Sequence, residues 1–237
     1  GREPEWVESA MSLWPRHLAG VACRQVHSKV KLSKEPLVDR IKNNIAWHLK
    51  GKPKLYATST FLYEACVDKV CVTRWFQHFN MPDTYLSWHL VTQLHVWMML
   101  TRIMAEPDEN RRTFLRNELC VNLWTDSQIR MDKLTALPRK TKQKCMTQLS
   151  QNFQATVLIC DEGLMKDDQA LAGALWRALF LCDEKLEDFG QLRTAVHYVR
   201  RNIASLDQLP SDRLDMEDGV QWKSLEESIM LTRENRR

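Results

Sequence analysis

The chain has 237 residues, 44% of them hydrophobic and only seven of them glycine, so its composition suits one packed domain and excludes a chain disordered throughout. Its net charge of +4 is uneven, because residues 1–10 carry −2, residues 11–34 carry +5 and residues 35–237 carry only +1. A nearly neutral body argues against a general nucleic-acid-binding protein, and we expect no DNA partner.

The basic segment 11–34 has the profile of a mitochondrial import sequence. Drawn as a helix, it places Trp14 and Leu18 on one side and Arg16 and Arg24 on the other, and it contains no acid. The alternative is a basic, disordered tail. We expect residues 1–34 to form an extension plus leader, residues 35–209 a helical domain and residues 210–237 a tail.

The seven cysteines are odd in number and widely spread, with no C-x-x-C pair and no histidine at zinc-ligand spacing. This pattern argues against a disulfide scaffold or a zinc site and predicts reduced, mostly buried thiols. Reduced thiols fit the cytosol, the nucleus or the mitochondrial matrix better than secretion.

Two helices are expected before Pro82. The first covers residues 36–49, and the second covers residues 59–79, where apolar side chains recur at helical spacing until Pro82 interrupts the pattern.

The most informative stretch follows, residues 82–103, with the sequence PDTYLSWHLVTQLHVWMMLTRI. Asp83 or Thr84 can cap a helix that is apolar on every side, which predicts a helix buried at the centre of a bundle. Polar residues such as His89 and His95 interrupt it, whereas a membrane span needs about 20 predominantly apolar residues.

Four more helices complete the expected bundle, over residues 108–134, 138–160, 168–182 and 188–207. Asp167 or Asp168 is expected to cap the third of these helices. The rest of the chain, which contains Trp222, is expected to be loosely attached. No stretch shows the alternation of a strand. The prediction is an all-α fold, a single bundle of about seven helices with a basic N-terminal leader and a loose C-terminal tail.

Motifs of the common enzyme classes, such as a P-loop, G-x-S-x-G or H-E-x-x-H, are absent, which argues against an enzyme. One acidic cluster, Asp161, Glu162, Asp167 and Asp168, could hold magnesium in a helical enzyme. Gly163 separates the two acidic pairs, however, so the spacing suits helix capping better than cation ligation. We expect no cofactor.

His95 and Arg102 lie seven residues apart on one line of the central helix. A buried histidine could ligate haem. The preferred interpretation is a polar core pair in which a neighbouring acid accepts hydrogen bonds, because buried polar groups need partners.

Two further patterns allow either a structural or a binding role. Ala170, Ala174 and Ala178 form a smooth line, with Gly173 beside it, that suits internal helix packing or a partner helix. The basic turn comprises Arg139, Lys140, Lys142 and Lys144, and it could contact RNA phosphates or anionic lipid, or form only a solvated face.

Three groups of residues resemble the signature of the ubiquinol–cytochrome c reductase chaperone family. The first is PDT-x₂-SW followed by LHVWM, within residues 82–98. The others are Asn152-Phe153 with Asp161-Glu162-Gly163-Leu164, Asp167-Asp168, Leu171-Ala172 and Ala174-Leu175-Trp176-Arg177, and then Tyr198-Val199-Arg200. The resemblance spans about residues 59–207.

The resemblance implies a non-enzymatic chaperone that binds newly synthesised cytochrome b and supports assembly of mitochondrial respiratory complex III. It also implies a small helical partner protein, proximity to the mitochondrial ribosome, and a location on the matrix side of the inner membrane. Signature residues expected to serve a partner, the client or the fold are Pro82, Asp83, Trp88, His95, Trp97, Asp161, Glu162, Asp168, Trp176 and Arg177.

Overall fold

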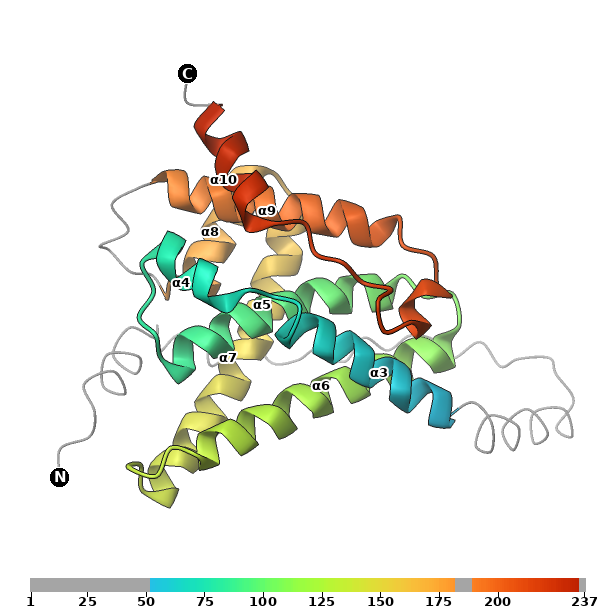
Figure 1. The fold of residues 1–237 in the computed structure, drawn as a ribbon, viewed down its shortest axis with the longest axis vertical. Coiled ribbons are helices and arrows are strands. Elements are labelled where there is room, and N and C mark those ends of the chain that lie inside the picture. Colours follow the sequence, from blue (N-terminus) through green and yellow to red (C-terminus); the bar gives the residue numbers. More distant parts are fainter. Residues whose placement is uncertain (1–51, 182–188, 235–237) are drawn as a thin grey trace, which may run out of the picture. The chain divides into compact units, whose positions relative to one another are not determined.

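The computed structural model describes residues 52–181 and 189–234 (Figure 1). The chain divides into two units, residues 1–54 and residues 55–237, and nearly all described residues belong to the second. The predictions of a leader over residues 11–34 and a helix over residues 36–49 lie outside the described residues.

Every regular element among the described residues is a helix, which confirms the all-α prediction. In chain order these are α3 (Lys52–Val67), α4 (Val72–Phe79), α5 (Tyr85–Met104), α6 (Glu109–Asp132), α7 (Arg139–Met165), α8 (Asp168–Ala178), α9 (Phe189–Asp207), the short 3₁₀-helix η3 (Arg213–Asp215) and α10 (Leu225–Glu234).

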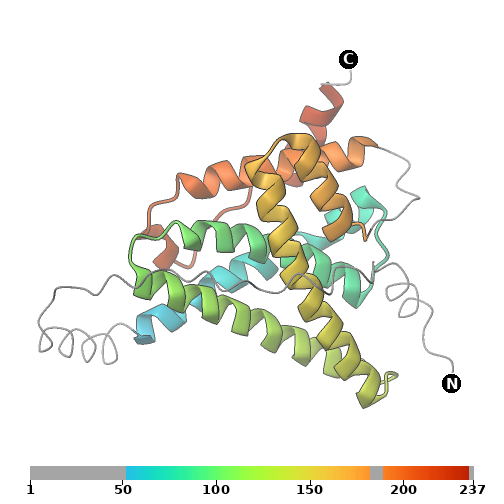
Figure 2. The same cartoon turned by 180° about the vertical axis from the view of Figure 1, so that it is seen from behind.

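The central helix is α5, as predicted. All side chains from His89 to Leu100 are buried, and α4, α6 and α9 pack against the helix. Thr84 is its cap, because the Thr84 side chain accepts a hydrogen bond from the Ser87 N–H. Figure 2 shows α7 crossing the opposite side of the bundle, with α8 beside it. Among the described helices, none combines the length and hydropathy that a membrane span requires.

The single helix expected over residues 59–79 is wrong, because the structure has two helices there. α3 starts earlier, at Lys52, since a proline at position 53 is tolerated in a first helical turn. The chain then turns between Val67 and Val72, where Val70 is buried. This turn lets α4 place Trp75 and Phe79 in the core, a change of direction that helical spacing cannot predict.

The prediction of a loosely attached C-terminal tail is also wrong for the described residues after position 209. Leu214 and Val220 are buried, and α10 packs on α9. The Trp222 indole N–H donates to the carbonyl oxygen of Ala65 at 2.7 Å, and its ring lies edge-on to His95 with centroids 4.8 Å apart. The apolar residues here are few and irregularly spaced, so they give no helical pattern although they fill gaps in the core.

A buried ionic cluster ties this segment to α5 and α6. Glu106 is 1% exposed, and its two carboxylate oxygens accept hydrogen bonds from Arg102 at 2.7 Å and Arg111 at 2.9 Å. Ser211 also donates to Glu106, and Arg111 pairs with Asp215. Burial alone would raise the pKa of Glu106, but hydrogen bonds from Ser211 and Arg102 outweigh burial and lower that pKa.

The alanine line of α8 packs internally, which is one of the two roles expected for it. An added Cβ at Gly163 on α7 would lie 2.9 Å from the Leu171 Cα and 3.1 Å from the Ala174 Cβ. Gly163 and Ala174 therefore permit a close approach of the two helices. Gly173 differs, because nothing lies within 4 Å of a Cβ added there.

Candidate functional site

His95 is part of the core and has both ring nitrogens hydrogen-bonded. Its Nδ1 lies 2.8 Å from the Val91 carbonyl oxygen and must donate, so Nε2 accepts from the Tyr198 hydroxyl at 2.8 Å. Burial lowers the pKa of His95 to about 4. Its partner is a tyrosine rather than the expected acid, and it is Arg102 that pairs with an acid. No ring nitrogen remains for haem iron.

The four carboxylates of the acidic cluster each have a different partner. Asp161 accepts from the Trp97 indole N–H at 2.8 Å, and Glu162 pairs with Lys166. Asp167 caps α8 by accepting from the Ala170 N–H, and Asp168 pairs with Arg200 at 2.9 Å. Within the described part of the chain, no group of His, Cys, Asp and Glu has a metal-binding arrangement.

The remaining signature residues divide between core and surface. Trp97 is fully buried, and Trp88 is half-buried beneath Arg130, whose guanidinium carbon is 4.2 Å from the ring centroid. Surface positions are taken by Pro82, Asp83 and Arg177, which are exposed, and Trp176, which is half-buried. The structure therefore does not gather the signature into one site.

The thiols agree in part with the expectation of buried, reduced cysteines. Among the described cysteines, Cys66, Cys145 and Cys160 are buried, Cys120 is half-buried and Cys71 is exposed, and all five are free. Burial raises the pKa of Cys160 to about 12, which keeps it an unreactive thiol.

The basic turn forms the start of α7. Arg139, Lys140 and Lys144 are exposed, whereas Lys142 is half-buried and donates to the Asp132 carbonyl oxygen at 2.9 Å. No side chain caps this helix, and its first turn contains no acid. Cations at a helix N-terminus add to the positive end of the helix dipole, so this tip attracts anions.

Several large apolar side chains remain exposed on the bundle. Met165 on α7 is 87% exposed and Leu158, two turns earlier, is 57% exposed. Three further methionines are about half exposed or more, namely Met104, Met216 and Met230. Methionine adapts its shape to varied partners, so it recurs on promiscuous binding surfaces.

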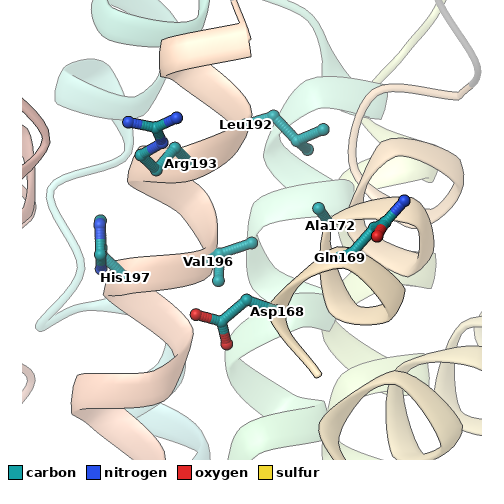
Figure 3. Close-up of a pocket in the computed structure, with 7 residues that line it drawn as sticks. All are labelled: Asp168, Gln169, Ala172, Leu192, Arg193, Val196 and His197. Carbon is teal, nitrogen blue, oxygen red and sulfur yellow. The ribbon is translucent and has the colours of Figure 1, made fainter. Parts of the chain in front are cut away.

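One groove lies between α8 and α9 and has a volume of 510 Å³ (Figure 3). Two apolar residues of α9, Leu192 and Val196, point toward Ala172 on α8 and form its floor. Polar side chains surround this floor, namely Asp168, Gln169, Arg193 and His197. The groove is not predictable from the sequence alone, where its one signal is the spacing of four between Arg193 and His197, which places both on one face of a helix.

The α9 wall of the groove is basic along successive turns. Arg200 is occupied by Asp168, and Arg201 pairs with Glu227. Arg193 is exposed and forms no hydrogen bond or ion pair with the residues that the structure describes. The Nε2 atom of His197 is buried and likewise lacks a hydrogen-bond partner among them.

The chain matches the family model described as ubiquinol-cytochrome C chaperone over residues 77–219. It is 40% identical to ubiquinol-cytochrome c reductase complex assembly factor 1 of Drosophila melanogaster over 193 residues, 80% of this chain and 73% of that protein. It is 35% identical to the Homo sapiens protein of the same name over 75% of this chain and 58% of that protein.

Two more distant proteins extend the comparison. Protein CBP3, mitochondrial, of Saccharomyces cerevisiae is 26% identical over 58% of this chain and 41% of that protein. The crystal structure of the Cbp3 homolog from Brucella abortus aligns with a TM-score of 0.57 at 19% identity, covering 81% of this chain and 98% of that one, and so shares the fold. The family model matches more than half of the chain, and the fruit-fly relative is 40% identical to it. The chain therefore belongs to the ubiquinol–cytochrome c chaperone family.

Proposed function

We propose that this chain is a non-enzymatic assembly chaperone for mitochondrial respiratory complex III, and that its client is newly synthesised cytochrome b. The family match over residues 77–219 carries the proposal, because that region includes most of the bundle. The relatives in fruit fly and human are named as assembly factors of this complex, and the yeast relative is named as mitochondrial.

The exposed apolar residues offer a physical means of shielding such a client. A protein with many membrane-spanning helices exposes apolar surface before insertion and aggregates in water. Met165 and Leu158 lie seven residues apart on one face of α7, where they can cover a client helix.

The proposal includes a location and two kinds of partner. The leader over residues 11–34 would direct the chain to the matrix side of the inner membrane. There it would act with a small helical assembly factor. The basic turn would hold the complex near the mitochondrial ribosome or the membrane surface, since both carry phosphates.

The first experiment removes the gene in the source organism and restores it with variants. Loss of the chain should lower cytochrome b and assembled complex III, measured by native gels, while other respiratory complexes fall less. The Met165→Glu, Leu158→Glu double variant should fold but recover less newly labelled cytochrome b, because a charge opposes apolar contact. Gln151→Glu, at an exposed position of α7, is the matched control. Normal complex III in the complete knockout contradicts the proposal.

The second experiment tests the basic turn with the full chain. Binding of the wild type to cardiolipin-containing vesicles and to ribosomal RNA is measured first. Replacing Arg139, Lys140 and Lys144 by glutamate should abolish binding to whichever of these two surfaces the wild type binds. Lys133→Glu, an exposed lysine in the adjoining turn, is the single-charge control. If wild type binds neither anionic surface, the turn is only a solvated face.

A further inference from the structure

We infer that the groove between α8 and α9 is a docking site for a helix of a partner protein, one that carries a carboxylate side chain beside apolar residues. This deepens the proposed function by naming a surface and the chemistry that it recognises. Three features of the structure support this inference: an apolar floor, an arginine on the α9 wall that has no acidic partner among the described residues, and an open glycine on α8 next to the lining residue Ala172.

The floor and the volume fit side chains of a helix. Leu192 and Ala172 are only half-buried although they face one another across the groove, and Val196 closes its base. A cleft of 510 Å³ falls within the range of specific ligand sites, about 300–1,000 Å³. Apolar residues at every third or fourth position of a partner helix are the usual filling of a groove between two helices.

The α9 wall supplies the charge complementarity. Arg193 and His197 lie one turn apart and both line the groove (Figure 3). Among the described residues the Arg193 guanidinium has no acceptor, whereas Arg200 and Arg201 farther along the same helix are each paired with an acid. A carboxylate placed beside Arg193 would provide the missing acceptor for its guanidinium.

The position of Asp168 limits where the acid of the partner can bind. The Asp168 carboxylate is at the opposite end of the groove from Arg193. At the Asp168 end the available cation, Arg200, is already paired with Asp168, whereas Arg193 has no acidic partner among the described residues, so the acid of the partner lies at the Arg193 end. The charges of the groove therefore place the acid of an amphipathic partner helix beside Arg193.

The α8 wall permits a close approach of that helix. Gln169, Ala172, Gly173 and Trp176 have the spacing of a single helical face, and this face is not buried. Glycine weakens a helix interior, so a glycine there needs a structural reason. At Gly163 the reason is the close contact between α7 and α8, but a Cβ added at Gly173 would meet nothing within 4 Å. A partner backbone that packs over Ala172 and Gly173 gives this second glycine a role, and Trp176 beside it offers the large ring typical of binding hot spots.

The test is selection of helical peptides on the full chain. A displayed library, randomised at positions i, i+3, i+4 and i+7 of a stable helix, would be selected on wild type and counter-selected on Gly173→Leu, which fills the α8 wall. Enriched peptides should carry Glu or Asp beside apolar residues. Arg193→Glu should lower their affinity by about tenfold, as expected for loss of a charged hydrogen bond. The same variant should favour peptides in which the acid is replaced by lysine.

Arg116→Glu is the matched control, because Arg116 is also an exposed helical arginine and bonds only to its neighbour Asn117 among the described residues. It should leave peptide affinity unchanged. Circular dichroism and unfolding curves check that each variant folds. The inference is overturned if no peptide is enriched, if enriched peptides lack acids, or if they bind the Arg193→Glu chain as well as wild type.

Failure here is distinguishable from failure of the proposed function. Complex III in the restored knockout reports on the proposed function, whereas peptide selection reports on the groove alone. If the chain selects acidic helices but does not restore complex III, the docking site is supported and the proposed function is contradicted. If the chain restores complex III but selects no acidic helix, only the docking site is contradicted.

Discussion

Tyr198 extends from α9 to the central helix and donates its hydroxyl hydrogen to His95 inside a ring of aromatic side chains. Trp75 lies edge-on to both residues, with centroids 5.4 Å from His95 and 4.9 Å from Tyr198. This cluster joins α4, α5 and α9 by polar and apolar contact at one point.

We expect Tyr198→Phe to destabilise the protein by about 1–3 kcal/mol, because it leaves the buried Nε2 of His95 without a donor while keeping the ring in place. Urea unfolding measures the loss. Tyr56→Phe is the control, since Tyr56 is 49% exposed and should lose little. Equal effects of the two substitutions would contradict the assigned hydrogen bond.

Two buried histidines predict how stability depends on pH. Burial lowers the pKa of both His89 and His95 to about 4, whereas the usual value is 6.5. The unfolded chain therefore binds protons between pH 6.5 and 4 that the folded chain excludes. Stability is fully present above pH 6.5 and is lost as the pH falls toward 4, by about 2 kcal/mol per histidine at pH 5.

Urea unfolding at a series of pH values from 7 to 5 measures this dependence. His89→Asn should remove about half of it, even though the substitution itself lowers stability at pH 7. An unchanged slope in that variant would show that His89 does not contribute to the dependence, and a flat profile in the wild type would show that burial does not lower the pKa of these histidines.

At the scale of elements, the two glycines of the α7–α8 hairpin make opposite predictions. Gly163→Ala forces a Cβ against backbone atoms of α8 and should destabilise the protein by about 1–3 kcal/mol. Gly173→Ala places its Cβ in open space and should stabilise the protein by about 0.5–1 kcal/mol, because alanine favours a helix.

Thermal and urea unfolding of the two variants, which differ only in the position of one methyl group, decide this prediction. The two changes in stability should have opposite signs. Destabilisation by both would mean that Gly173 faces the protein interior, which would also remove one support of the docking site.

Local chemistry explains which elements could be predicted from the sequence. α5 was predictable because it is apolar on all sides, and the caps at Thr84 and Asp167 were among the residues expected for that role. The turn between α3 and α4 was not, since Val67, Val70 and Trp75 keep a helical spacing across it. Spacing along a chain reports which faces are apolar but not where a helix changes direction.

The candidate sites were harder to predict than the fold for a related reason. His95 and Trp97 are conspicuous in the sequence, yet both serve the core. Arg193 and His197 gave no motif, because the groove requires α8 to lie beside α9. Whether a cation has an acid nearby depends on such tertiary contacts, and sequence spacing reveals only the contacts within one helix.

At the scale of the whole molecule, the ionic cluster at Glu106 joins parts of the chain that are about a hundred residues apart. Glu106→Gln should destabilise the protein by about 3–5 kcal/mol, because Arg102 and Arg111 would keep buried charges without a full counterion. Hydrogen exchange should show the loss at residues 209–215 as well as at the end of α5.

Glu162→Gln is the matched control for that prediction. Glu162 forms an ion pair at the same spacing of four residues, but on the surface, so its loss should have little effect on unfolding. Similar unfolding curves for the two variants would mean that the Glu106 cluster contributes no more than an ordinary surface pair.

The position of Trp222 determines when the core of the protein can close during synthesis. A ribosome releases α3, α5 and α9 before it releases Trp222, yet the indole fills the space beside His95 and satisfies a carbonyl group of α3. The nascent chain therefore carries an unsealed interior until residue 222 has been translated. A nonsense mutation just after Leu209 would remove Trp222 and α10, and the shortened product would be a substrate for proteolysis.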